Sequence, residues 1–237
     1  CFFSKHLAGL DYLRLGKTLK DLGFPAVDLT VRPQGHVLPE RAAEDLPRAV
    51  RTLREQGVEV PMITTGLLAA TEPAARPILS TAGKLNVPFF KPGYYRYGDL
   101  KAVEQRVREA REQLRGLVEL ARQFRIQAGF HNHSGAYVGA AMWDAWEVVR
   151  DLDPQWAGFY FDPGHAVAEG GSGGWNIGFH LLAPRMRMLA AKDFYWEKAG
   201  GKWRMKWCPL GEGMVPWPTV FQQLAAAGFR GPISLHL

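Results

Sequence analysis

The stretch GFYFDPGHAVA, residues 158–168, decides the fold of this chain. An aromatic run ends abruptly at the carboxylate of Asp162, and the Pro-Gly that follows predicts a tight turn presenting His165. The same plan occurs earlier, in AGFHNHSG at residues 128–135. Two successive strands that end in metal-binding, proton-transferring side chains predict an active site on one rim of a parallel barrel.

Apolar β-type runs alternate with longer amphipathic stretches along the whole chain, which predicts βα units and a parallel sheet. The expected strands are residues 1–4, 26–30, 58–64, 87–91, 126–132, 157–162, 186–192 and 232–237. The expected helices are residues 11–22, 40–56, 72–85, 99–124, 141–151, 176–182 and 217–227. This order predicts a single-domain (β/α)8 TIM barrel over residues 1–237, with its final helix absent from this chain. A doubly wound open sheet competes, but no GxGxxG follows the first strand and no GxxxxGK[ST] occurs.

Length and composition fit one large domain, with 237 residues, 47% of them hydrophobic, and a net charge of +6. The basic residues lie mostly in helical stretches such as 101–125, where they alternate with glutamates and predict a solvated face rather than a nucleic-acid surface. No apolar run reaches the roughly 18–20 residues that span a membrane. Cys1 and Cys208 form no CxxC or zinc-ribbon spacing. Because the chain begins without Met, we expect a removed leader, with a cytoplasmic location favoured and export after signal cleavage as the alternative.

Polar residues gather where the expected strands end, and in a barrel those ends face one rim. A carboxylate at the end of an apolar strand needs a facing cation or strong donor, and strand alternation sends His131 and His133 to one face. We therefore expect a divalent metal (Mn, Mg, Co or Zn) on His131 and Asp162. The proton-transfer candidates are His133, His165, Lys192 and Glu212. The substrate-binding candidates are His6, Arg32, Lys91, Asn132 and Asp193.

Each of these residues also has a structural interpretation. Asp162 could cap the turn that follows it, and His165 could stabilise a loop. Lys192 and Asp193 could form an ion pair. The aromatic-rich segment 194–215 predicts an extended loop or a small hairpin over the rim, which could stack on a ligand or act as a packed lid.

Five segments together resemble the sugar phosphate isomerase/epimerase superfamily, the xylose isomerase-like TIM barrels. They are GFHNHSG (129–135), YFDPGHA (160–166), AAKDF (190–194), PLGEG (209–213) and GPISLH (231–236). The resemblance extends over essentially the whole chain. It implies a divalent metal at the barrel mouth, held by Glu, Asp, His and Glu on the fifth to eighth strands. It also implies proton transfer beside the carbonyl of a ketose or aldose.

This chain departs from that pattern at the metal. Asp162 is retained, but His131 stands in place of the fifth-strand Glu and Ala190 in place of the seventh-strand His. The eighth-strand Glu would follow Leu237. The two glutamates also serve as the acid/base pair in members that interconvert epimers, so their mechanism does not carry over whole.

We therefore expect a sugar or sugar-like polyol isomerase or epimerase that uses metal-assisted proton transfer. A small-molecule sugar is the expected partner, without nucleic acid or membrane, and a homodimer is the expected assembly. The first alternative, supported by Ala190, is a metal-free degenerate barrel that binds carbohydrate without turnover. A remote alternative is a DNA repair enzyme like endonuclease IV, which needs three zinc ions and more ligands than seven histidines readily supply.

Overall fold

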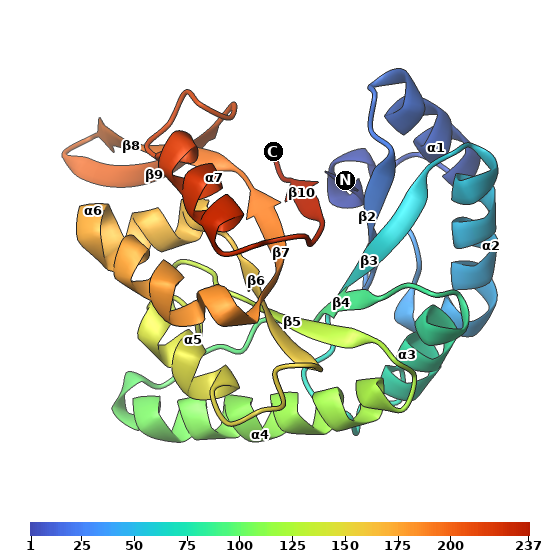
Figure 1. Cartoon of the computed structure of the whole chain (residues 1–237), viewed down its shortest axis with the longest axis horizontal. Coiled ribbons are helices and arrows are strands. Elements are labelled where there is room, and N and C mark those ends of the chain that lie inside the picture. The colour runs from blue at the N-terminus through green and yellow to red at the C-terminus, as the bar shows by residue number, and fades with distance from the viewer.

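The computed structural model describes all of residues 1–237, and its parallel strands form a closed barrel with helices around it (Figure 1). The barrel strands are β1 (Phe2–Phe3), β2 (Ala26–Val31), β3 (Glu59–Thr65), β4 (Phe89–Lys91), β5 (Gln127–His131), β6 (Ala157–Phe161), β7 (Met186–Ala191) and β10 (Ile233–Leu235). They close in the order β1-β10-β7-β6-β5-β4-β3-β2. Because β1 pairs with β10, the two ends of the chain meet. The predicted barrel is confirmed.

Amphipathic helices cover the outside of the barrel. They are α1 (Tyr12–Asp21), α2 (Ala42–Glu55), α3 (Ala75–Lys84), α4 (Val103–Arg122), α5 (Met142–Val149), α6 (Pro163–Leu182) and α7 (Trp217–Ala226). On α4 the outer face carries ion pairs one turn apart, such as Arg106 with Glu109, as predicted for a solvated face. β10 is the last element of residues 1–237. None of the helices is long and apolar enough to cross a bilayer.

The tight turn expected after Asp162 is wrong, because α6 begins directly at Pro163. Asp162 is the N-cap, and its Oδ1 accepts the His165 backbone N–H at 3.0 Å. Proline suits the first helical position, where an N–H would have no partner. The helix expected only from residue 176 therefore starts much earlier. It is kinked at Gly171, whose φ of 58° lies in a region that glycine adopts readily and other residues rarely do.

Residues 194–215 contain the small hairpin that the sequence left as one option. Its strands are β8 (Asp193–Ala199) and β9 (Lys202–Cys208), paired antiparallel. The buried carboxylate of Asp193 holds the turn that follows, accepting N–H bonds from Gly211 at 2.9 Å and Gly213 at 3.2 Å. A Cβ on Gly213 would lie 2.2 Å from Asp193 Oδ1, so only glycine lets the chain pass this closely.

Two apolar layers enclose the sheet. Phe159 and Phe161 belong to the large layer between strands and helices, whereas Tyr160, between them in sequence, packs inside the barrel with Met188 and Ala190. This is the alternation that a barrel strand requires. The inner apolar cluster is small, and the inward-facing residues nearer the C-terminal strand ends are polar. These polar side chains form the floor of the candidate site.

Candidate active site

A cavity of about 270 Å³ opens at the C-terminal ends of the barrel strands. Six of the predicted site residues line it: His6, Arg32, Lys91, His131, His133 and Lys192. Tyr94, Tyr160, Trp207 and His236 complete much of the remaining wall. Another hollow, of about 290 Å³, lies near the starts of β4 and β7 and contains arginines as its only charged residues. The groups capable of acid/base chemistry therefore gather in the cavity at the C-terminal rim.

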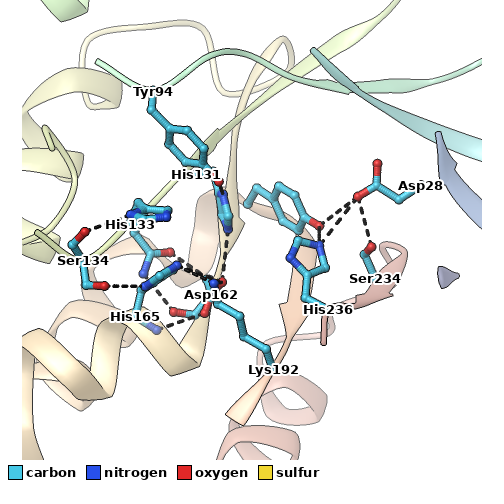
Figure 2. A network of polar contacts seen from close by, with 12 residues as sticks. Asp28, Tyr94, His131, His133, Ser134, Asp162, His165, Lys192, Ser234 and His236 are labelled. Carbon is cyan, nitrogen blue, oxygen red and sulfur yellow. Dashed lines mark hydrogen bonds and ion pairs between the residues drawn. The ribbon is translucent and has the colours of Figure 1, made fainter. Parts of the chain in front are cut away.

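Asp162 lies at the centre of the polar network and is fully buried (Figure 2). Its Oδ2 is 3.3 Å from Lys192 Nζ and 3.4 Å from His131 Nε2, and His165 Nε2 is 3.8 Å away. Burial alone would raise the pKa of Asp162, but the Lys192 ammonium, with the His131 N–H directed at the carboxylate, outweighs it and holds that pKa well below its usual range. The group is therefore a carboxylate, and the lysine ammonium is its counterion.

Lys192, His165 and Ser134 form a chain of hydrogen bonds (Figure 2). Lys192 Nζ lies 2.5 Å from His165 Nε2, and His165 Nδ1 lies 2.7 Å from Ser134 Oγ. An ammonium only donates, so Nε2 accepts and the ring proton sits on Nδ1. Burial lowers the pKa of His165 well below its usual range, in agreement with a neutral ring. Burial also lowers the pKa of Lys192, while Asp162 acts in the opposite direction.

His133 has one ring nitrogen free for proton transfer. Its Nδ1 is 2.8 Å from the Ser134 carbonyl oxygen, which can only accept, so Nδ1 carries the hydrogen and Nε2 keeps its lone pair. The ring packs against Tyr94, Tyr137 and His165. Burial lowers the pKa of His133. His133 is thus a neutral base in the cavity wall.

His131 is held between Tyr94 and Asp162. Tyr94 Oη is 2.9 Å from His131 Nδ1, and burial raises the pKa of this tyrosine, so its hydroxyl acts as the donor. The remaining hydrogen of His131 is then on Nε2, toward Asp162. Burial lowers the pKa of His131 to about 3. The imidazole is neutral across the physiological range.

A second buried carboxylate, Asp28 on β2, lies deeper in the barrel (Figure 2). It accepts hydrogen bonds from Thr64 at 2.8 Å, from Ser234 at 3.0 Å and from Tyr160 at 3.3 Å. His236 Nε2 is 3.1 Å from the same tyrosine hydroxyl and 3.8 Å from the carboxylate. Sequence reasoning did not select Asp28 or Tyr160 for the site. The available signal was a carboxylate in the middle of the apolar strand AVDLTV.

Besides Asp162 and His165, three predicted site residues do not line the cavity. Asn132 is buried and bonded at both amide atoms to the Asp162 backbone, each at 2.8 Å, so it joins β5 to β6. Asp193 is occupied by backbone N–H groups and the Trp217 indole, and it forms no ion pair with Lys192. Glu212 is exposed on the loop after β9. These placements correct the substrate-binding roles of Asn132 and Asp193 and the proton-transfer role of Glu212.

The predicted metal ligands come together, but they do not form a metal site. His131 Nε2 and Asp162 Oδ2 are both buried without a hydrogen-bond partner, as a ligand pair would be. Yet no third His, Cys, Asp or Glu joins them, and position 190 is a buried alanine. The Lys192 ammonium instead lies against the only carboxylate. A divalent ion needs more donors and no cation there, so this donor set does not fit one.

Comparison with known proteins places the chain in a family. The family model described as "Xylose isomerase-like TIM barrel" matches residues 17–237. No curated protein sequence matches the chain.

Solved structures share the fold at low sequence identity. The probable 3-DHS dehydratase of petrobactin synthesis from Bacillus anthracis is 16% identical, with a TM-score of 0.76 over 100% of this chain and 91% of that one. A D-tagatose 3-epimerase-like protein is 19% identical, with a TM-score of 0.73 over 92% and 84%. A Mycobacterium smegmatis barrel in complex with magnesium is 16% identical, with a TM-score of 0.73 over 97% and 82%. At these identities the likeness concerns the fold alone.

Proposed function

The chain belongs to the xylose isomerase-like TIM barrel family, and on this premise we propose that it is an isomerase or epimerase of a sugar or sugar-like polyol. The observation that carries the proposal is the pairing of a neutral base, His133, with a cation, Lys192, in the wall of one cavity. Proton transfer beside a carbonyl requires these two groups. Structural neighbours that include an L-ribulose 3-epimerase support this class of reaction.

In the proposed step, His133 Nε2 removes the proton from the carbon beside the substrate carbonyl. The electron pair of the broken C–H bond forms the C=C bond of an enediolate, and the carbonyl π pair moves onto oxygen. The Lys192 ammonium stabilises that oxygen and donates a proton to it, which leaves a neutral amine. The His133 proton then returns to the former carbonyl carbon, while the hydroxyl of the first carbon gives its proton to the Lys192 amine and becomes the new carbonyl, which yields the isomer. Return of the proton to the first carbon, after the intermediate has turned its other face to His133, yields the epimer.

Asp162 and His165 position the lysine rather than touch the substrate. Neither residue lines the cavity, and both contact the Lys192 amine. The carboxylate keeps the amine charged, because an opposite charge at 3.3 Å favours the ammonium. We therefore propose a reaction that needs no divalent metal, in place of the metal-assisted mechanism expected from the sequence.

Deuterium wash-in tests the proposal. The protein, dialysed against EDTA, is incubated in D2O with a panel of ketoses and aldoses, and NMR measures deuterium at the carbon next to the carbonyl. We expect exchange with at least one sugar, a loss of at least 100-fold in His133→Gln and Lys192→Met, and no loss in Lys198→Met, an exposed lysine on β8. Exchange that appears only after Mn²⁺ is added would contradict the metal-free reaction. Sugar-dependent thermal stabilisation without any exchange would instead favour a barrel that binds carbohydrate without turnover.

A further inference from the structure

The cavity carries more positive than negative charge. Four cationic side chains line it, Lys5, Arg32, Lys91 and Lys192, and no aspartate or glutamate does. Two carboxylates lie close by, Asp162 and Asp28. Asp162 is paired with Lys192, and the three nearest donors to Asp28 are uncharged hydroxyls.

Lys91 is the least compensated of these cations. It ends β4, is 3% exposed, and forms no ion pair or side-chain hydrogen bond. Its Nζ lies 3.3 Å from the centre of the Tyr94 ring, which is the main electrostatic contact it has. Burial, followed by the charge of Arg32, lowers the pKa of Lys91 well below its usual range, and the opposing effect of the Asp28 carboxylate does not offset them. A buried amine without a counterion is costly unless something supplies one.

Arg32 has an unused donor on the same side of the cavity. It directly follows β2, and its Nε is buried without any hydrogen-bond partner. The guanidinium carbon lies 5.8 Å from the centre of the Phe3 ring, so an aromatic face rather than a carboxylate covers it. Guanidinium groups bind carboxylate and phosphate through paired N–H donors. The orphaned Nε is therefore a donor without an acceptor, next to an amine without a counterion.

We propose that the cavity binds an anionic sugar derivative, with its carboxylate or phosphate held by Arg32 and Lys91. This inference deepens the proposed function and rests on it only for the reacting end of the ligand. The anion would lie on the β2–β4 side of the rim, and the carbonyl end would face His133 and Lys192 on the β5–β7 side. Neutral sugars would leave both cations uncompensated and would bind more weakly.

Binding of three probes tests the inference at constant ionic strength. D-gluconate carries a carboxylate, inorganic phosphate carries the other anion, and neutral D-sorbitol matches gluconate in its hydroxyls. We expect calorimetric titration to give binding at least tenfold tighter for gluconate or for phosphate than for sorbitol, and the tighter anion identifies the substrate class. Arg32→Gln and Lys91→Met should each weaken that binding at least tenfold. Arg204→Gln, an exposed arginine on β9 outside the cavity, should not.

The free variants supply a second readout. Removing a buried amine that has no ion pair or hydrogen bond relieves its desolvation cost, so Lys91→Met without ligand should melt at a higher temperature than the parent. Equal binding of sorbitol and both anions, or equal affinities in Lys91→Met and Arg204→Gln, would overturn the inference. Anion binding without deuterium exchange would leave this site standing and refute the proposed reaction. Exchange on neutral sugars with no preference for anions would refute this anion site and leave the proposed reaction standing.

Discussion

Acidification should destabilise this protein through His131 before it protonates most carboxylates. The ring is fully buried, and burial lowers its pKa from 6.5 to about 3 in the folded state. An unfolded chain therefore binds a proton at this ring between these two pH values while the folded chain does not. The free energy of unfolding then rises with pH through this window, and stability is lost as the pH falls below 6.5.

The size of the effect follows from the shift. A pH of 5 is about 1.5 units below the pKa of this ring in the unfolded chain, so the ring is protonated there, whereas in the folded chain it is still neutral. One unit is worth about 1.4 kcal/mol, so His131 alone costs about 2 kcal/mol between pH 8 and pH 5. This is a large share of the 5–15 kcal/mol that typically stabilises a domain.

The assay is urea unfolding of the EDTA-treated protein and of His131→Gln at pH 8 and pH 5. Glutamine keeps an acceptor for the Tyr94 hydroxyl but does not titrate. For each protein, the free energy of unfolding at pH 5 is subtracted from that at pH 8, and this difference should be about 2 kcal/mol smaller in His131→Gln than in the parent. His180→Gln, an exposed histidine on α6, is the matched control and should change that difference by less than about 0.5 kcal/mol. An unchanged pH dependence in His131→Gln would refute the reasoning, because it would mean that His131 has the same pKa in the folded and the unfolded parent protein.

Two further predictions concern catalysis and the hairpin. Burial lowers the pKa of His133 and of Lys192, so the exchange rate should rise with pH at a midpoint below 6.5, where the base becomes neutral, and fall at a midpoint below 10.5, where the ammonium is lost. A single limb, or an acid limb that remains in His133→Gln, would contradict the assignment. Asp193→Asn should lower the free energy of unfolding by about 2–4 kcal/mol in urea, because the amide leaves at least two buried N–H donors without an acceptor. A loss under about 1 kcal/mol would mean that the loop is held by other contacts.

The barrel could be predicted because its signals are periodic and repeated. Apolar strands alternating with amphipathic helices determine the layers, and parallel strands of this number close in few ways. The start of α6 was missed for a local reason. Asp-Pro-Gly favours a turn and a helix N-terminus through the same first hydrogen bond, from the His165 N–H to the Asp162 side chain, and local sequence does not say whether the chain continues as a helix.

The site was predicted by location better than by role. Six of the residues predicted from strand ends line the cavity, because the fold brings those ends together. Residue type does not say which partner a polar group takes. Asn132, an amide, and Asp193, a carboxylate, both follow barrel strands, yet they form their hydrogen bonds mainly with backbone groups. Asp28 was overlooked because it lies in the middle of β2, three residues before the strand ends at Val31. Its side chain points into the barrel below the rim.

The substitutions at the expected metal position are consistent with one another. A divalent ion is stable where several carboxylates or imidazoles converge on it. Here a neutral imidazole, His131, stands at one such position and the methyl group of Ala190 at another, which leaves Asp162 as the one carboxylate among the expected ligands. One carboxylate is matched by one ammonium, and Lys192 supplies it at 3.3 Å. A monovalent cation fixed by the chain can stabilise an enediolate oxygen, and unlike a metal it can also give and take back a proton there. The absence of these ligands therefore does not by itself imply an absence of chemistry, because the Asp162–Lys192 pair leaves an ammonium capable of the reaction at the cavity wall.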